Sequence, residues 1–278
     1  MKEISQFTFL GFLTMLIGIL KVVCATLIIF SVAMYVFQRN LIYFPAHEEP
    51  SRQVYHAADM QELRLETSDG IDLLAWYKPA KENQPTILFL HGNAGHIGYR
   101  MFLARAFMDA GFGVLLLEYR GFGVNKGSPT EEGFYTDART AIHFLQQQGI
   151  SASHLVLYGE SIGTGVAVKM AEEFSTCSVV LQSPYTSLTA VARYHYPWIF
   201  IPPWDKYNSL ARIHHVKAPL LILHGKQDKL IPFEQGLTLF KQANEPKTFV
   251  ALDDKDHHNL WDPHFVKTVI SFIQSHCI

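Results

Sequence analysis

The chain has 278 residues, a formal net charge of −2, 49 % hydrophobic residues and 17 % charged residues. The length suits one large domain or two small ones, and the near-neutral charge, without basic runs or a phosphate-binding glycine-rich loop, gives no reason to expect nucleic acid as a partner. The three cysteines, Cys24, Cys177 and Cys277, are odd in number and widely spaced, which predicts neither a disulfide framework nor a zinc site.

The N-terminal segment carries most of the apolar excess. Residues 7–37 contain one charged residue, Lys21, and exceed the about 20 apolar residues that span a bilayer. A secretory signal peptide is the alternative, but the apolar run resumes after Lys21 and no small-residue cleavage site follows cleanly. We therefore expect an uncleaved membrane anchor over residues 1–38, with its core at Val22–Phe37 and the preceding stretch in or along the interface. The Lys and Arg residues are equal in number before and after this core and give no orientation.

A connector over residues 39–60 is expected to lead into a domain at 61–278. Residues 62–77 predict an antiparallel hairpin around a Ser-Asp-Gly turn. Apolar strands and amphipathic helices then alternate, which is typical of a parallel sheet covered on both faces. The fold class is therefore α/β, with a mostly parallel eight-stranded sheet. The expected strands are 85–92, 112–121, 154–159, 177–184, 218–225 and 247–254, and the expected helices are 99–111, 130–149, 162–174, 233–243 and 263–277.

The sequence Gly159-Glu160-Ser161-Ile162-Gly163 is a G-x-S-x-G motif between a predicted strand and a predicted helix. In such an elbow a sharp, strained turn exposes the serine hydroxyl, and the small glycines avoid collisions with neighbouring backbone. The helix N-terminus favours the negative charge that develops in acyl transfer. The alternative is a glycine-rich turn with a capping serine. The strand–turn–helix setting favours Ser161 as a nucleophile.

The stretch FLHGNAG (89–95) follows another predicted strand. Acyl transfer needs two backbone N–H groups that face the developing oxyanion. In this type of site one comes from the residue after the serine, here Ile162, and the other from the loop after the third strand, here Asn93. We expect His91 in the same stretch to be a structural histidine.

Asp228 lies just beyond the strand at 218–225, at the edge where parallel sheets place their active sites. The chain order Ser161, Asp228, then His257 or His258 is the order typical of α/β hydrolases. The histidine would accept the serine proton and the aspartate would orient the histidine. Asp205, Asp253, Asp254 and Asp256 are the alternatives for the third member, but Asp205 lies in an irregular segment and the other three are too near the histidines in sequence to be an independent support.

These motifs resemble the α/β-hydrolase superfamily, and within it the Bem46/ABHD13-like group of membrane-anchored serine hydrolases. The resemblance rests on QRNLIYFP, FLHGNAG, GESIG, QSPYTSL, LHGKQDKLIP and HHNLW, within residues 38–261. The group is similar in having Gly-x-His-Asn around its catalytic histidine, which implies that His258, before Asn259, is the general base. This chain departs from the group at Asp256 and His257, which stand where small residues are usual.

The expected function is a serine hydrolase that cleaves an ester or thioester of a lipid-like or small acyl substrate, with the membrane as partner through the N-terminal helix and with no cofactor or metal. A short insertion at 184–215 breaks the strand–helix alternation. Its aromatic residues are expected to line an acyl pocket or face the membrane, or else to pack the insertion onto the sheet. They are Tyr194, Tyr196, Trp198, Phe200 and Trp204.

Three other functions fit parts of the sequence. An aminopeptidase or amidase would use the same triad, with Glu160 as the available carboxylate for a substrate amine. A non-catalytic, membrane-tethered binding module would keep the fold without the reaction, although every catalytic role has a residue here. A metal site at residues 254–258 is disfavoured, because adjacent side chains diverge and the helical i,i+4 spacing of metal motifs is missing.

Overall fold

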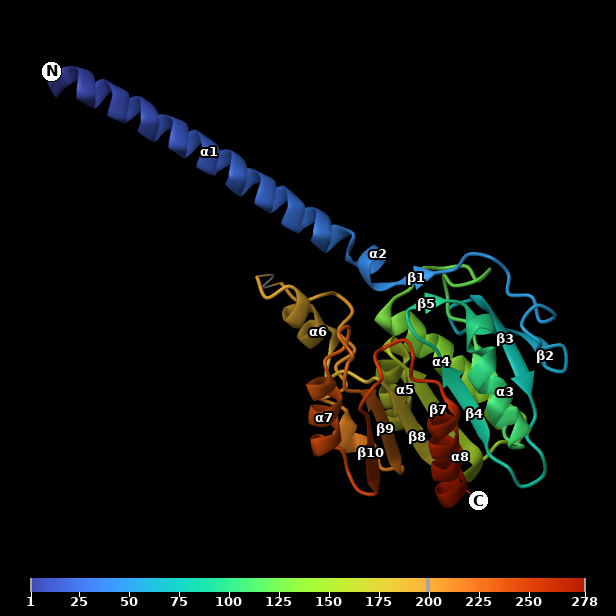
Figure 1. Ribbon diagram of the computed structural model, residues 1–278. Helices are drawn as coiled ribbons and strands as arrows, with labels where there is room; N and C mark the ends of the chain where they lie inside the picture. Colours follow the sequence, from blue (N-terminus) through green and yellow to red (C-terminus); the bar gives the residue numbers. More distant parts are fainter. Residues whose placement is uncertain (1, 199–200, 278) are drawn as a thin grey trace. The chain divides into compact units, whose positions relative to one another are not determined.

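The computed structural model describes residues 2–198 and 201–277, and the chain divides into two compact units, Met1–Ile42 and Tyr43–Ile278 (Figure 1). The division falls inside the segment 39–60 that was predicted to be a connector. Most of that segment therefore belongs to the second unit.

The first unit consists of helix α1 (Lys2–Val36) and the short helix α2 (Gln38–Ile42). Residues Leu10–Val36 form 27 residues of helix with a mean hydropathy of 2.5, and their most apolar part is not buried within the structure. This helix is long and apolar enough to cross a membrane, a property that signal sequences share. The helix runs through Lys21 without a break, and the interfacial location of the stretch before Val22 stays a prediction.

The second unit is built on a sheet of eight strands in the order β10-β9-β8-β7-β4-β6-β3-β2. Strands β2 and β3 form the predicted antiparallel hairpin, β3 is antiparallel to β6, and the other pairs are parallel. The predicted α/β fold with a mostly parallel eight-stranded sheet is confirmed. The strands are β2 (Gln61–Glu66), β3 (Asp72–Lys78), β4 (Thr86–Leu90), β6 (Gly113–Leu117), β7 (Leu155–Glu160), β8 (Ser178–Gln182), β9 (Leu220–Gly225) and β10 (Lys247–Leu252).

Helices cover both faces of this sheet (Figure 1). Helix α3 packs with α8 on one face and α4 with α5 on the other, which is the layer arrangement that strands buried on both faces require. The helices are α3 (Met101–Asp109), α4 (Glu131–Gln147), α5 (Ile162–Glu173), α6 (Leu188–His195), α7 (Phe233–Gln242) and α8 (Pro263–Cys277), with 3₁₀ turns η1 (Ile97–Arg100), η2 (Ala152–His154) and η3 (Ile213–His215).

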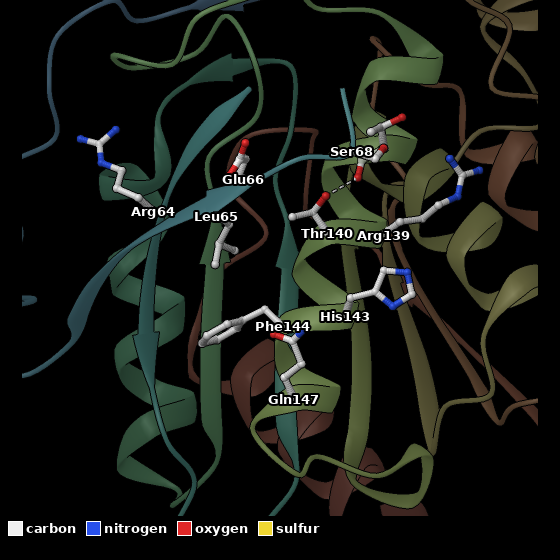
Figure 2. Close-up of a pocket in the computed structure, with 10 residues that line it drawn as sticks. Arg64, Leu65, Glu66, Ser68, Arg139, Thr140, His143, Phe144 and Gln147 are labelled. Atoms are coloured by element: carbon white, nitrogen blue, oxygen red, sulfur yellow. Dashed lines mark hydrogen bonds between the residues drawn. The ribbon is translucent and has the colours of Figure 1, made fainter. Parts of the chain in front are cut away.

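A groove of about 560 Å³ lies between the edge strand β2 and helix α4. Figure 2 shows Leu65 of β2 and Phe144 of α4 close to one another, with His143 on α4 and Arg64 on β2 also among the lining residues. It has no lining residue in common with the motifs at Asn93, Ser161, Asp228 and His257. The groove is therefore separate from the site that those four residues are predicted to form.

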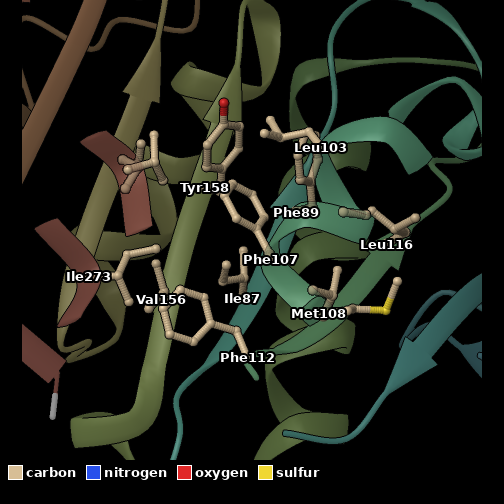
Figure 3. Packing of buried hydrophobic residues seen from close by; sticks show 14 of the residues in the cluster. Ile87, Phe89, Leu103, Phe107, Met108, Phe112, Leu116, Val156, Tyr158 and Ile273 are labelled. Carbon is tan, nitrogen blue, oxygen red and sulfur yellow. The ribbon is translucent and has the colours of Figure 1, made fainter. Parts of the chain in front are cut away.

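The core positions the strand that carries Ser161. Alternate residues of the central strands point to one face and pack with α3 and α8, because successive side chains of a strand alternate between faces. Figure 3 shows Phe89 of β4 against Tyr158 of β7, with ring centroids 4.6 Å apart, and Phe107 of α3 beside Tyr158. The hydroxyl of Tyr158 donates to Gln182 Oε1 at 2.5 Å. These contacts fix β7 at the residue directly before the elbow motif, which begins at Gly159.

Two cysteines form a disulfide, contrary to the expectation from their spacing. Cys177, just before β8, is bonded to Cys277, at the end of α8, across a sequence separation of 100 residues and a Cα–Cα distance of 5.3 Å. Both residues are buried, and Cys24 is the free cysteine among the described residues. The expectation that the cysteines do not pair is therefore wrong, because the sheet and α8 bring together residues that are remote in sequence.

Candidate active site

Ser161 lies at the sharp turn between β7 and α5. Its φ of 51° and ψ of −116° are outside the ordinary regions for an L-residue, which is the strained conformation of a nucleophile elbow. The flanking glycines permit the turn. A Cβ at Gly159 would lie 2.7 Å from the carbonyl oxygen of Gly163, and a Cβ at Gly163 would collide with the carbonyl oxygen of Leu90. The predicted elbow is therefore present in its geometry.

Ser161, His257 and Asp228 form one continuous chain of hydrogen bonds. Ser161 Oγ lies 3.0 Å from His257 Nε2, and His257 Nδ1 lies 2.7 Å from Asp228 Oδ2. An ionised carboxylate only accepts hydrogen bonds, so the hydrogen of a neutral His257 is on Nδ1. Nε2 is then free to accept the hydrogen bond, and later the proton, of the serine hydroxyl.

The histidine at this position is His257, so the prediction of His258 is wrong by one residue. Asp256 Oδ1 accepts from the backbone N–H of His258 at 2.8 Å, and the backbone N–H of Asp256 donates to Asn259 Oδ1 at 2.8 Å. These bonds form a tight turn that directs His257 toward Ser161 and leaves His258 exposed. Gly225 of β9 admits this loop, because a Cβ there would collide with the carbonyl oxygen of Lys255.

Asp228 follows β9 and is buried. Its Oδ1 accepts from the backbone N–H groups of Leu230 and Ile231 at 2.9 and 2.8 Å. Burial opposes ionisation, but hydrogen bonds from His224 and His257, the charge of His257 and the Ile231 amide outweigh it and hold the pKa of Asp228 well below its usual range. Of the other aspartates, Asp253 pairs with Lys226, Asp256 caps the loop turn, and Asp205 bonds the Tyr43 hydroxyl.

The loop that contains Asn93 is held by the segment that was predicted to be a connector. Strand β1 (Phe44–Pro45) runs parallel to β5 (Ala94–Gly95), the backbone N–H of Phe44 donates to the carbonyl of Asn93 at 2.8 Å, and that of Ala46 donates to Gly95 at 3.0 Å. Ile162 is the first residue of α5, where backbone N–H groups lack partners within the helix. Asn93 and Ile162 thus occupy the loop and helix positions from which the sequence predicted an oxyanion hole.

A largely buried ion pair connects the same loop to the turn that carries Ser161. Arg100 binds Glu160 through two hydrogen bonds, 2.9 Å from Nε and 3.1 Å from Nη2, and its Nη1 donates to the carbonyl of Ala94 at 2.8 Å. Burial opposes ionisation of Glu160, but the charge and hydrogen bonds of Arg100 outweigh it and lower the pKa of Glu160. Sequence reasoning missed Arg100, because the two partners are 60 residues apart and share no motif.

His91 is fully buried, as expected for a structural histidine. Its Nδ1 lies 2.7 Å from the carbonyl of Gly92 and its Nε2 lies 3.2 Å from Glu118 Oε1. The ring also packs against Tyr119, with centroids 4.5 Å apart. Nδ1 is thus hydrogen-bonded within the domain, while Nε2 lies close to Glu118 without forming a hydrogen bond to any of the described residues.

The aromatic residues of the insertion lie at the surface. Tyr194 and Trp198 have 59 % and 65 % of their surface exposed, and Tyr196 and Trp204 each have 45 %. The exposure means that these four do not serve mainly to pack the insertion onto the sheet. Phe200 lies outside the described residues. The role of the insertion's aromatic residues in a substrate pocket stays a prediction.

Comparison with known proteins identifies the family of this fold and site. Residues 81–204 match the hydrolase family described as "Serine aminopeptidase, S33". An uncharacterized protein of Mycobacterium tuberculosis (strain ATCC 25618 / H37Rv) is 37 % identical over 246 residues, covering 86 % of this chain and 87 % of the relative. The chain belongs to the α/β-hydrolase family.

Two further relatives of this α/β hydrolase have descriptive names. Protein bem46 of Schizosaccharomyces pombe is 29 % identical over 245 residues, 81 % of each chain. The lysophosphatidylserine lipase ABHD12 of Danio rerio is 31 % identical over 196 residues, covering 62 % of this chain and 51 % of the lipase. The predicted resemblance to the Bem46 group is confirmed, and the hydrolase has lipase-like relatives.

Among solved structures, an esterase of Pyrococcus furiosus superposes with a TM-score of 0.72 at 18 % sequence identity, covering 85 % of this hydrolase and all of the esterase (100 %). At that identity the similarity establishes the fold.

Proposed function

We propose that this α/β hydrolase is a serine hydrolase that cleaves ester or thioester bonds through Ser161, His257 and Asp228. The observation that carries the proposal is the unbroken chain of hydrogen bonds from Ser161 Oγ through His257 to Asp228. The strained elbow and the position of Ser161 at the N-terminus of α5 support it. Because all three residues of this hydrogen-bonded series are present, a non-catalytic binding module is the less well supported function.

The proposed reaction has two steps. Ser161 Oγ attacks the substrate carbonyl carbon while His257 Nε2 takes the hydroxyl proton, and the backbone N–H groups of Asn93 and Ile162 bind the oxyanion. The carbon–oxygen or carbon–sulfur bond then breaks, and His257 returns the proton to the leaving alcohol or thiol. In the second step water attacks the acyl-enzyme while His257 Nε2 takes its proton; the bond between the acyl carbon and Ser161 Oγ then breaks, His257 returns the proton to Ser161 Oγ, and the free acid is released. Asp228 stabilises the imidazolium in both steps.

We propose lipid-like acyl esters as the substrate class. Three observations support this choice: the apolar helix Leu10–Val36, the exposed aromatic residues of the insertion, and the lipase among the relatives. An enzyme held at a bilayer meets lipid esters at high local concentration. Tyr and Trp are also the residues that proteins place at membrane interfaces, since one end is apolar and the other polar.

We further propose that the N-terminal helix is an uncleaved anchor and that the hydrolase domain faces an oxidising compartment. The Cys177–Cys277 disulfide supports the second part, because disulfides form and persist in secreted, lumenal and periplasmic environments and are rare in the cytosol. The charges that flank the helix are balanced and give no orientation, so the disulfide is the stronger indicator.

An aminopeptidase is the second candidate, favoured by the description of the matching family. A peptidase of this kind needs a carboxylate that is free to bind the substrate amine. Glu160 is the carboxylate next to the nucleophile, and its two oxygens bind Arg100. The ester reading is therefore the better supported one.

The two functions are separated by substrate. Purified full-length protein in detergent is assayed with p-nitrophenyl esters of increasing acyl length and with aminoacyl p-nitroanilides, and the Ser161→Ala variant serves as the blank. We expect hydrolysis of the esters, with preference for longer chains, and loss of that activity in Ser161→Ala. Hydrolysis of the anilides alone would favour the aminopeptidase, and equal ester hydrolysis by the blank would contradict both.

A further inference from the structure

A second histidine, His224, lies against the carboxylate that binds His257. His224 belongs to β9 and is fully buried. Its Nε2 lies 2.9 Å from the carbonyl oxygen of Ile231 and 3.4 Å from Asp228 Oδ2. That carboxylate oxygen is the one that accepts the hydrogen bond from His257 Nδ1. One oxygen of Asp228 therefore faces two imidazole rings.

His224 also closes the turn that holds Asp228. The backbone N–H groups of Leu230 and Ile231 bind Asp228 Oδ1, which fixes one side of the carboxylate. The carbonyl of Ile231 in turn accepts from His224. Ile231 is thus bound to Asp228 through its N–H and to strand β9 through its carbonyl. Without His224 the carbonyl of Ile231 would lose its link to the sheet.

The contacts of His224 fix its protonation. The Ile231 carbonyl and the ionised Asp228 both accept hydrogen bonds, so Nε2 carries a hydrogen. Nδ1 faces Gly236 of α7, where an added Cβ would collide with it, and no hydrogen-bond partner for it occurs in the described part of the chain. A second proton on Nδ1 would be a buried charge without an acceptor. His224 is therefore a neutral donor.

Among the described residues whose contacts with His224 are known, one carries a titratable side chain. Asp228 is the charged side chain that the ring faces, while α7 contributes Gly236 and the ring of Phe233, whose centroid is 5.7 Å away. On the other side of Asp228, His257 faces Ser161 and the ring of His258. A change at His224 can thus reach the reaction through Asp228.

We propose that His224 is a positioning residue for the proposed serine hydrolase reaction: as a neutral donor it holds the Asp228 turn and carboxylate in the orientation that binds His257 Nδ1–H. The inference rests on the proposed function. It acts through Asp228 and involves no contact with the substrate. Loss of the donor would let Asp228 move away from His257, which lowers both the basicity and the alignment of the imidazole.

The test uses three single variants of the full-length protein, one double variant that combines His224→Leu with Gly236→Ala, and a fluorophosphonate probe. The rate of labelling is measured from about pH 5 to 9, the range in which histidine changes charge. His224→Leu removes the donor. His224→Gln keeps an uncharged N–H donor near the position of Nε2. Gly236→Ala keeps the imidazole but presses on Nδ1. Far-UV circular dichroism and thermal unfolding report whether each variant is folded.

We expect His224→Leu to label about tenfold more slowly, the effect of losing one oriented hydrogen bond, and its acid limb to move to lower pH because His257 loses part of the Asp228 charge. His224→Gln is expected to stay within about threefold of wild type with an unchanged acid limb. Gly236→Ala is expected to slow labelling in the wild-type background and to add nothing in the His224→Leu background, since the two changes act on one contact.

Two results would overturn the inference. One is a folded His224→Leu variant that labels at the wild-type rate with an unchanged acid limb. The other is equal slowing of the Leu and Gln variants with no change in the acid limb, which indicates packing alone. If His224→Leu does not fold, normal labelling by a folded Gly236→Ala variant contradicts the inference. Wild-type protein that does not label refutes the proposed function as well, so the two failures are distinguishable.

Discussion

His257 Nε2 lies 3.0 Å from Ser161 Oγ, while the adjacent His258 is exposed to solvent. Two neighbouring side chains of the same type thus have different environments. The difference comes from the turn between Asp256 and Asn259, which directs one ring inward and the other outward. It makes a paired substitution experiment informative, because the two variants change the same chemical group one residue apart.

The first prediction concerns these two histidines. His257→Ala is expected to lower the rate of ester hydrolysis by about 10²- to 10⁴-fold, which is the range attributed to general acid–base catalysis. His258→Ala, the matched control, is expected to stay within about threefold of wild type, because exposed side chains without buried contacts contribute little. Initial rates with a p-nitrophenyl ester measure both. Loss of activity in His258→Ala alone would reverse the assignment.

The second prediction concerns the largely buried Glu160–Arg100 pair. Glu160→Gln removes the charge that Arg100 binds, and we expect a loss of about 1.5–3 kcal/mol in the free energy of unfolding at pH 7, the usual contribution of a hydrogen bond to a charged group. The pKa of Glu160 is lowered on folding, so its contribution to stability is present above the unfolded value near 4.5 and is lost as the pH falls through the lower folded value.

The cost of Glu160→Gln should therefore shrink below about pH 4, where the wild-type carboxyl itself becomes protonated. Glu173→Gln is the matched control, because Glu173 pairs with Arg139 near the surface and such pairs contribute about 0–1 kcal/mol. Denaturant unfolding at several pH values measures both variants. Equal effects of the two substitutions at pH 7 would contradict the structural role given to Glu160.

The third prediction concerns the pH dependence of activity. Hydrogen bonds hold the pKa of Asp228 well below its usual range despite burial, so Asp228 stays ionised across any practical assay range. The fall in kcat/KM on the acid side should then be a single step within the range of about pH 5 to 8 in which histidine changes charge. Rate profiles against pH test this. Two protons on the acid limb would indicate that Asp228 titrates as well.

The fourth prediction concerns the disulfide. In denatured protein purified from membranes without reductant, one thiol, Cys24, is expected to react with a maleimide, and three are expected after reduction. Cys177→Ser should cost about 2–5 kcal/mol in stability, as the removal of native disulfides does, and Cys24→Ser should have little effect. Three reactive thiols before reduction would contradict the oxidising location proposed for the domain.

The positions of Ser161 at the elbow and of Asp228 at a strand end were predictable because each is a local pattern. Ser161 stands between a strand and a helix that the sequence shows by its apolar periodicity, and Asp228 follows a strand of the same kind. In a parallel sheet the carboxyl ends of such strands meet at one edge. Residues far apart in sequence could thus be brought together by topology alone.

The residues that were missed depend on contacts that no local pattern encodes. The choice between His257 and His258 is made by a loop that packs on Gly225 of β9, and the Cys177–Cys277 bond is made by the packing of α8 on the sheet. The pairing of Phe44–Pro45 with the Asn93 loop is likewise a long-range contact in a segment that had the composition of a connector.

The most direct test of the central claim is the site of fluorophosphonate modification. Full-length wild type, Ser161→Ala and His257→Ala are incubated with the probe, digested and mapped by mass spectrometry. The account predicts a single phosphonylated residue, Ser161, in the wild type, no adduct in Ser161→Ala, and an adduct that forms at least about 10²-fold more slowly in His257→Ala. A wild-type adduct on another residue, or undiminished labelling of Ser161→Ala, would contradict it.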